Sequence, residues 1–133
     1  MEKDKRYNVL IVEDKQCYWE PLKLCLNQSD DFVTMGVTGS ESEALKLVKA
    51  GLPDVVIVDL QLTDGEGDGL QLLQQIRDLQ GLIEISPYLL VLTNVKSERT
   101  WERLNDGLAD ISFSKNAKGY IGLFPNHHLK WWS

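Results

Sequence analysis

The sequence predicts an α/β protein in which an open parallel sheet is covered by helices on both faces. Along its 133 residues, apolar β-rich runs alternate five times with segments of helical character. Two of these runs, residues 55–60 and 88–93, place apolar residues on both faces, as strands inside a parallel sheet do. Right-handed crossovers between parallel strands leave few other arrangements for such an alternation.

The first strand and helix are expected near the start of the chain. Residues 9–12 are an apolar run, and a stretch that contains three leucines follows it. Pro21 in this stretch either delays the start of the helix or kinks its first turns. The spacing of Cys17 and Cys25 matches neither a disulfide between neighbouring turns nor a metal site, which predicts two reduced, half-buried thiols.

The second strand is expected at residues 32–37, and the helix after it carries its own boundary signals. Ser40 and Glu43 have the spacing of a capping box, and Gly51 stands where the helix should end. Residues 55–60 then form the third strand.

Leucines and an isoleucine recur at helical spacing over residues 70–79, which predicts the third helix. The fourth strand, residues 88–93, follows a proline, which is tolerated at the beginning of a strand. A short polar helix closed by glycine is expected at residues 97–107, and the fifth strand at residues 109–114. Beyond it two glycines and a proline oppose helix formation, so we expect at most a short helix near residues 117–124.

Length and charge limit the classes of function. The chain fits one ordinary domain, which we expect at residues 1–125, with residues 126–133 as a tail or the start of a truncated region. A net charge of -6 argues against general attraction to nucleic acid or to anionic lipid. The chain has neither a membrane-spanning run nor a signal-peptide pattern, so we expect a cytoplasmic protein that binds neither nucleic acid nor membrane directly.

Three carboxylates are expected to converge at one edge of the sheet if the first and third strands are neighbours. Glu13 and Asp14 end the first strand, and Asp59 ends the third. Ligands of open parallel sheets bind beyond the carboxyl ends of the strands, where the strand order reverses. Like charges at such a place demand a counter-charge, which Mg²⁺ and Lys115 at the end of the fifth strand can supply.

Such a cluster has a specific chemistry. A carboxylate beside Mg²⁺ can attack a phosphoryl group and form an acyl phosphate. Lys115 and the metal would offset charge on the transferred oxygens, and Thr93 at the end of the fourth strand would donate a hydrogen bond to one of them.

The sequence resembles the response-regulator receiver domain of two-component signalling. The resemblance covers the chain from Val9 to about Phe124. It rests on "VED" at residues 12–14, "VDLQL" at residues 58–62, the threonine that closes the fourth strand, and "FSK" ending at Lys115. All four elements occur in order, each at the end of a strand.

The resemblance implies a site and a strand order. It makes Asp59 the phosphoacceptor for a phosphohistidine. Glu13, Asp14, Asp59 and the backbone carbonyl of Gln61 would hold Mg²⁺. The implied fold is the flavodoxin-like order 2-1-3-4-5, which agrees with the alternation of elements described above.

The resemblance also implies partners and a mode of action. Thr93 matches the hydroxyl residue that moves toward the phosphate, and Lys115 matches the lysine that pairs with it. The donor would be a histidine kinase or a histidine phosphotransfer protein. The domain would then act as a switch rather than a turnover enzyme, with a homodimer or an output domain meeting its strand 4–strand 5 face.

The loop after the phosphoacceptor departs from the family pattern. Residues 59–69 make it two residues longer than usual, and Thr63 stands where proline is common. Its glycines predict a mobile loop. Asp64, Glu66 and Asp68 are interpreted as solvated turn residues without a chemical role.

The fifth strand and the terminus depart as well. Ser112 occupies the position of the family's aromatic switch residue, and Phe113 should point to the opposite face. Asn116 replaces a common proline, and the adjacent residues His127 and His128 are interpreted as exposed and inert.

Tryptophans leave two interpretations open. Trp101 is either an exposed anchor for a partner or a side chain lying over the edge of its own core. Trp131 and Trp132 belong to a tail or to the beginning of a truncated region.

Other classes of function are weighed against the receiver. A pseudo-receiver, which uses the fold only for protein interaction, is motivated by Ser112 and the longer loop. An FMN-binding flavodoxin would need a phosphate-binding loop after the first strand, which the sequence lacks. A Mg²⁺-dependent phosphohydrolase would need a second aspartate where Gln61 stands.

Overall fold

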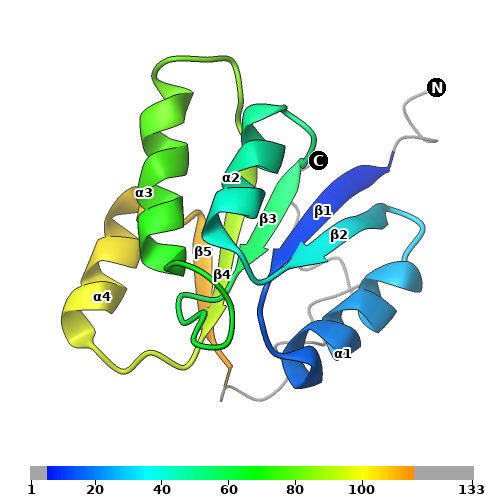
Figure 1. Ribbon diagram of the computed structural model, residues 1–133, viewed down its shortest axis with the longest axis horizontal. Helices are drawn as coiled ribbons and strands as arrows, with labels where there is room; N and C mark the ends of the chain where they lie inside the picture. The colour runs from blue at the N-terminus through cyan, green and yellow to red at the C-terminus, as the bar shows by residue number, and fades with distance from the viewer. Residues whose placement is uncertain (1–5, 116–133) are drawn as a thin grey trace.

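The computed structural model describes residues 6–115 and has the predicted architecture (Figure 1). Its sheet contains five parallel strands in the order β2-β1-β3-β4-β5, which confirms the predicted order. The elements are β1 (Tyr7–Val12), α1 (Gln16–Asn27), β2 (Phe32–Thr38), α2 (Glu41–Lys49), β3 (Val55–Val58), α3 (Gly69–Gln80), β4 (Tyr88–Thr93), α4 (Glu98–Arg103), the π-helical turn η2 (Leu104–Leu108) and β5 (Ile111–Ser114). The predicted segment at residues 117–124 and the terminal histidines and tryptophans lie outside the described residues.

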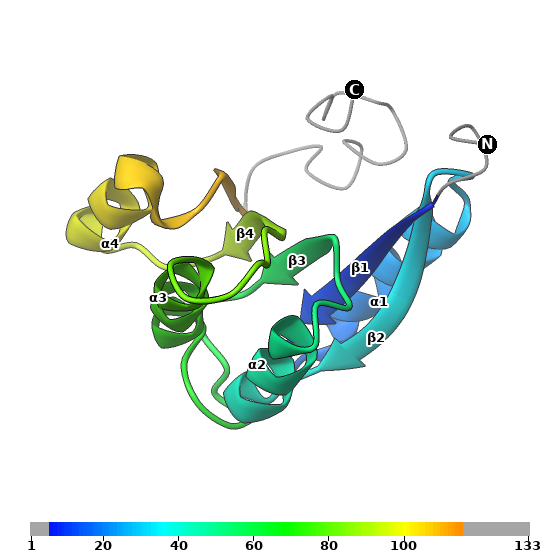
Figure 2. The same cartoon turned by 90° about the horizontal axis from the view of Figure 1, so that it is seen from above.

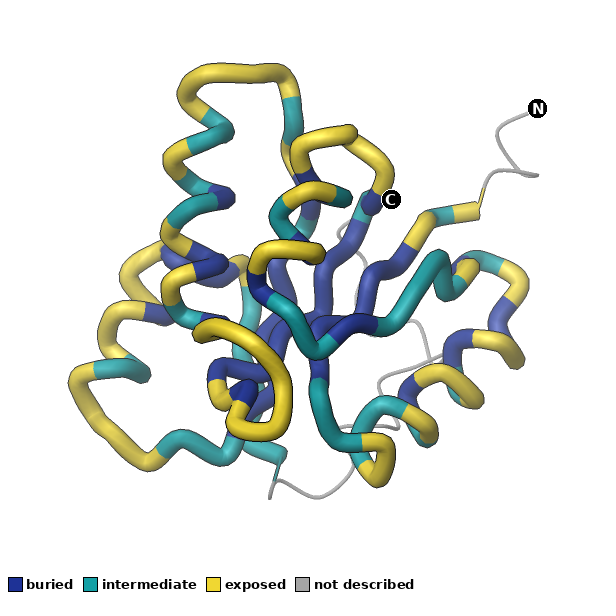
Figure 3. Tube along the Cα trace, viewed as in Figure 1, coloured by how far each residue is buried: buried dark blue, intermediate teal, exposed yellow. Residues whose placement is uncertain are grey.

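Helices cover both faces of the sheet. α2, α3 and η2 bury Val48, Leu73 and Leu104 against one face. On the other face, α1 packs Leu22 and Leu26 against apolar residues of β1, β3 and β4. Figure 2 shows α2 and α3 on the same side of the sheet. The middle strands are therefore buried, and their tube in Figure 3 is dark blue over most of its length.

Two strands are shorter than predicted. β3 ends at Val58 instead of residue 60, because the chain turns there and the backbone N–H of Gly69 donates to the carbonyl of Leu60 at 3.2 Å. β5 begins at Ile111, two residues later than predicted. The first shift matters for the site, because Asp59 lies just beyond β3 and not within it.

The helix boundaries test the signals found in the sequence. α1 begins at Gln16 and contains Pro21, so the delayed start considered for this helix is wrong. The hydroxyl of Ser40 accepts a hydrogen bond from the backbone N–H of Glu43 at 3.1 Å, as the capping-box pattern predicted. Gly107 closes the α4–η2 segment with a φ of 107°, a conformation that favours glycine.

The two cysteines are free, and only one is half-buried as predicted. Cys25 is partly covered, and its burial raises the pKa of the thiol. Cys17 is exposed, contrary to expectation, because it lies on the outer side of the first turn of α1. Within residues 6–115 no helix has both the length and the apolar character needed to cross a membrane.

Candidate functional site

The three predicted carboxylates meet at the carboxyl edge of the sheet. β1 and β3 are neighbours, with Val12 paired to Val58, so the residues that follow each strand lie side by side. Glu13, Asp14 and Asp59 each offer an oxygen, and these oxygens lie within 4.8 Å of one another. Asp59 is 6% exposed and Glu13 is 4% exposed, so two of the three carboxylates are almost removed from water.

Lys115 joins this cluster from the end of β5. Its Nζ donates to Oε1 of Glu13 at 2.5 Å and to Oδ2 of Asp59 at 2.8 Å. The backbone N–H of Lys115 donates to the carbonyl of Thr93 at 3.0 Å, which fixes the lysine relative to β4. The ammonium therefore neutralises part of the negative charge that the fold brings together.

The electrostatics of the cluster are visible in two shifted pKa values. The pKa of Glu13 is raised to about 7, chiefly by burial and also by the nearby charge of Asp59, while the hydrogen bond and charge of Lys115 act in the opposite direction. Burial alone would lower the pKa of Lys115, but its hydrogen bonds to Asp59 and Glu13 outweigh burial and raise it. The lysine thus stays charged, while Glu13 holds a proton more readily than an exposed glutamate does.

The other predicted site residues are also at this edge. Oδ1 of Asp59 accepts a hydrogen bond from the backbone N–H of Gln61 at 3.1 Å. Thr93 is fully buried at the end of β4, and its Oγ1 accepts from the backbone N–H of Val95 at 3.3 Å. A ligand role for the Gln61 carbonyl and movement of Thr93 toward a phosphate stay predictions.

The donor set fits a divalent cation that prefers oxygen. Oδ1 of Asp14 is buried and finds no hydrogen-bond partner within residues 6–115, although a buried carboxylate oxygen ordinarily has one. Asp14 offers one carboxylate oxygen to the same cluster as Glu13 and Asp59. Carboxylate oxygens at this separation suit Mg²⁺, so these three residues would hold the ion.

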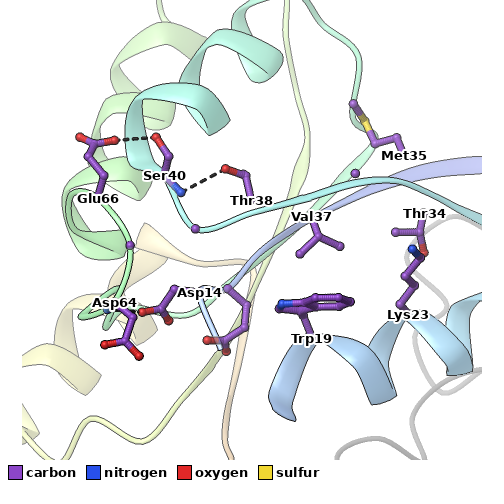
Figure 4. Close-up of a pocket in the computed structure, with 14 residues that line it drawn as sticks. Asp14, Trp19, Lys23, Thr34, Met35, Val37, Thr38, Ser40, Asp64 and Glu66 are labelled. Atoms are coloured by element: carbon purple, nitrogen blue, oxygen red, sulfur yellow. Dashed lines mark hydrogen bonds between the residues drawn. The ribbon is translucent and has the colours of Figure 1, made fainter. Parts of the chain in front are cut away.

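The loop between β3 and α3 is more tightly held than its sequence predicted. Near the site, the backbone N–H of Asp64 donates to Oδ2 of Asp14 at 2.5 Å, and its carboxylate pairs with Lys15 at 2.6 Å. Figure 4 shows the side chains of Asp14 and Asp64 next to each other. The loop therefore touches one of the cluster's carboxylates directly.

Further along, the same loop is bound to the start of α2. Oε1 of Glu66 accepts a hydrogen bond from the hydroxyl of Ser40 at 2.6 Å (Figure 4) and another from the hydroxyl of Ser42 at 2.9 Å. These bonds lower the pKa of Glu66. Asp68 caps α3 through its side chain, and its backbone N–H donates to Glu41 at 2.8 Å. Asp64, Glu66 and Asp68 are exposed, as predicted for residues of a solvated loop, and each also makes specific contacts that the sequence did not predict.

Two glycines of this loop are required by close contacts. A Cβ on Gly65 would lie within 2.0 Å of the Gly39 carbonyl oxygen. Gly67 has a φ of 91°, and a Cβ there would lie 2.3 Å from the Cβ of Glu41. These glycines therefore allow the loop to pack closely against distant parts of the chain. The sequence predicted mobility instead, because local sequence does not reveal such long-range contacts.

Tyr18 and Asn94 were missed by the sequence analysis. The Tyr18 ring lies 3.6 Å from Nζ of Lys115, measured to the ring centre, and its hydroxyl accepts from Nδ2 of Asn94 at 3.3 Å. The sequence contains only weak signals for these two residues. Tyr18 is an aromatic residue in the first turn of the helix that follows the acidic pair, and Asn94 follows Thr93.

The structure decides two further interpretations. Phe113 packs with the same apolar cluster on the α1 side of the sheet as Ile111, two residues earlier, so alternation along β5 places Ser112 on the opposite face, as predicted. Trp101 is half-buried against the opposite cluster, and its indole N–H donates to the Val95 carbonyl at 2.8 Å. Trp101 thus lies over the edge of its own core.

A groove of about 740 Å³ opens beside the cluster. It runs from Asp14 and the exposed acids of the β3–α3 loop toward Trp19 of α1 and Val37 of β2 (Figure 4). Glu13 and Asp14 of the cluster line this groove, whereas Asp59 and Lys115 do not.

Comparison with protein families identifies the class of protein that this fold and site define. The family model of the response regulator receiver domain matches residues 9–118. The chain belongs to this family, whose members generally bind Mg²⁺ and take part in two-component regulation.

The similar curated proteins include enzymes and transcription regulators. A protein-glutamate methylesterase/protein-glutamine glutaminase from Syntrophomonas wolfei is 29% identical over 120 residues, which is 89% of this chain and 32% of that protein. The DNA-binding transcriptional activator DevR/DosR of Mycobacterium tuberculosis is 35% identical over 77 residues, which is 56% of this chain and 36% of that protein. The chain spans about a third of the length of these relatives.

Solved structures support the fold. A DNA-binding response regulator of the LuxR family from Staphylococcus aureus has a TM-score of 0.72 at 22% identity, covering 84% of this chain and 88% of that chain. The response regulator domain of Thermotoga maritima CheB has a TM-score of 0.69 at 20% identity, covering 91% and 90%. At these identities the likeness concerns the fold alone.

Proposed function

We propose that Asp59 is the phosphoacceptor of a two-component phosphorelay and takes a phosphoryl group from the phosphohistidine of a histidine kinase or a histidine phosphotransfer protein. The observation that carries this proposal is the contact of 2.8 Å between Lys115 and Asp59 inside a cluster of three carboxylates. An ammonium group at this position can stabilise the negative charge of a phosphoryl group during its transfer.

In the proposed reaction, a carboxylate oxygen of Asp59 attacks the phosphorus, the bond from phosphorus to the histidine nitrogen breaks, and the imidazole leaves. Lys115 offsets the charge on the phosphoryl oxygens, and the hydroxyl of Thr93 donates a hydrogen bond to one of them. Mg²⁺, held by Glu13, Asp14, Asp59 and the Gln61 carbonyl, would supply further charge neutralisation.

The phosphoryl group is then a switch. It adds negative charge in a water-poor pocket, which draws Thr93 and Lys115 inward and shifts an equilibrium between two arrangements of the face formed by β4 and β5. That face would contact an output domain or a second copy of the chain. Phosphorylation is thus proposed as a cytoplasmic signal rather than a step of turnover, within a domain that spans residues 1–125.

Intact-mass measurement after incubation with Mg²⁺ and acetyl phosphate tests the proposal. Wild-type protein should gain the mass of one phosphoryl group, and hydroxylamine should remove it because it cleaves acyl phosphates. Asp59→Asn should abolish the gain. The matched control is Asp64→Asn, which removes an exposed acid of the neighbouring loop and should leave the gain intact. Absence of any gain in wild type would contradict the proposal.

Two observations favour a second candidate, a pseudo-receiver that acts only through protein contacts. Ser112 occupies the usual position of the aromatic switch residue. The β3–α3 loop next to the site is held by hydrogen bonds to Asp14 and Ser40. Mg²⁺ binding in calorimetry without any mass gain from acetyl phosphate would favour this candidate over the phosphoacceptor.

A further inference from the structure

Lys115 has a third neighbour besides the two carboxylates that accept its hydrogen bonds. Its Nζ faces the ring of Tyr18 at 3.6 Å from the ring centre. The Lys115 side chain is 4% exposed, and the attraction between a cation and an aromatic face is stronger where water is excluded. The ammonium is therefore held by Tyr18 of α1 as well as by Glu13 and Asp59 at the sheet edge.

The hydroxyl of the same tyrosine reaches the end of β4. It accepts a hydrogen bond of 3.3 Å from Nδ2 of Asn94, the residue after Thr93. Oδ1 of Asn94 is buried and has no hydrogen-bond partner within the described part of the chain. This amide thus has capacity for another bond and can exchange partners when Thr93 moves.

From these contacts we propose that Tyr18 is a positioning residue of the phosphoacceptor site and couples it to α1. Its ring holds Lys115 beside Asp59, and its hydroxyl links α1 to the segment that begins with Thr93. The proposal rests on the proposed function, because it concerns what α1 does when Asp59 is phosphorylated. It also provides an aromatic residue for the switch in a chain that carries Ser112 at the usual aromatic position.

The coupling follows from charge and distance. A phosphoryl group on Asp59 places negative oxygens beyond the carboxylate, so Lys115 shifts toward them and its contact with the Tyr18 ring changes. Thr93 moves toward the same oxygens and carries Asn94 with it, which alters the bond to the Tyr18 hydroxyl. Both displacements converge on one side chain of α1.

Two substitutions separate the ring from the hydroxyl. Tyr18→Leu removes both contacts, and we expect acyl-phosphate formation from acetyl phosphate to slow about tenfold because Lys115 is less firmly placed. Tyr18→Phe keeps the ring and should restore the rate to within about twofold of wild type. Leu24→Ala, at a side chain of α1 that is 58% exposed, is the control and should leave the rate unchanged.

The hydroxyl link is tested by the response of α1 to phosphorylation. In wild type, the backbone amide resonances of α1 should shift when acetyl phosphate and Mg²⁺ are added. Tyr18→Phe and Asn94→Ala should each reduce these shifts by a similar fraction, and the double variant should reduce them no further, since both remove one bond. Thermal unfolding of each variant checks that the fold is retained.

The outcomes distinguish this proposal from the proposed function. If wild type gains no phosphoryl mass, the proposed function fails and this inference fails with it. If wild type gains the mass and Tyr18→Leu reacts at the wild-type rate with unchanged α1 shifts, the inference alone is wrong. Additive effects of Tyr18→Phe and Asn94→Ala would overturn the link through the hydroxyl.

Discussion

Glu13→Gln should stabilise the metal-free protein at neutral and alkaline pH. Burial first, and then the charge of Asp59, raise the pKa of Glu13 from 4.5 to about 7. In that interval the folded protein binds a proton that the unfolded chain has released, so stability falls as pH rises from 4.5 to about 7. Above this interval the loss is constant.

The magnitude follows from the same shift. At 1.36 kcal/mol for each pKa unit, the change from 4.5 to about 7 corresponds to about 3 kcal/mol. Gln has no charge to desolvate and can still accept the hydrogen bond from Lys115, although less strongly than a carboxylate. We therefore expect Glu13→Gln to be more stable than wild type by about 1–3 kcal/mol above pH 7, and to lose the pH dependence of this group.

Urea unfolding in the presence of a chelator, at about pH 5 and about pH 8, measures the effect. The control is Glu84→Gln, which changes an exposed glutamate and should follow wild type at both pH values. Added Mg²⁺ should stabilise wild type more than Glu13→Gln, because the ion replaces the missing counter-charge. If Glu13→Gln shows the wild-type pH slope and the wild-type stability, the explanation by burial and like charge is wrong.

Two further predictions concern packing, and urea unfolding with the midpoint and slope compared to wild type measures both. Gly67→Ala should lower the free energy of unfolding by about 1–3 kcal/mol, because it places a side chain on a left-handed backbone against Glu41. The control is Gly81→Ala, which should be neutral because the added Cβ lies 3.6 Å from the nearest atom. Equal effects of the two substitutions would contradict the close contact at Gly67. Leu73→Ala should lose about 2–5 kcal/mol from a fully buried position, and Leu82→Ala, 80% exposed, should lose almost nothing.

The fold could be predicted because its signals are local. Apolar runs mark the buried strands, and the alternation of strands with helices fixes the parallel sheet. The cluster could be predicted once the family resemblance supplied the strand order, because the carboxyl ends of neighbouring strands lie together, and Glu13 meets Lys115 across 102 positions of sequence. The end of β3 was wrong by two residues, because the turn in which Gly69 bonds to Leu60 is a tertiary contact. The start of β5 was also wrong by two residues.

The contacts of the β3–α3 loop could not be predicted from local sequence. Ser40 and Glu66 meet across 26 positions, and nothing near either residue indicates the other. Glycines among acidic residues favour a mobile loop when only neighbours are considered. The same glycines are needed once the backbone passes close to Gly39 and Glu41. The sequence therefore indicated that this loop departs from the family pattern, but it explained the glycines by mobility and not by close packing.

The excess negative charge of the cluster lowers the stability of the folded protein, whereas contacts from the surrounding residues hold the cluster in place. Three carboxylates and one ammonium leave the ionised cluster with a net charge of -2, and with its pKa raised to about 7, Glu13 binds a proton below that pH and relieves part of this charge. A divalent cation can replace that proton, because it neutralises the charge without protonating a ligand. Mg²⁺ binding should accordingly release a proton below pH 7. The contacts of Asp64 to Asp14 and of Tyr18 to Lys115 come from outside the cluster, so they can hold its charged groups in place in either state.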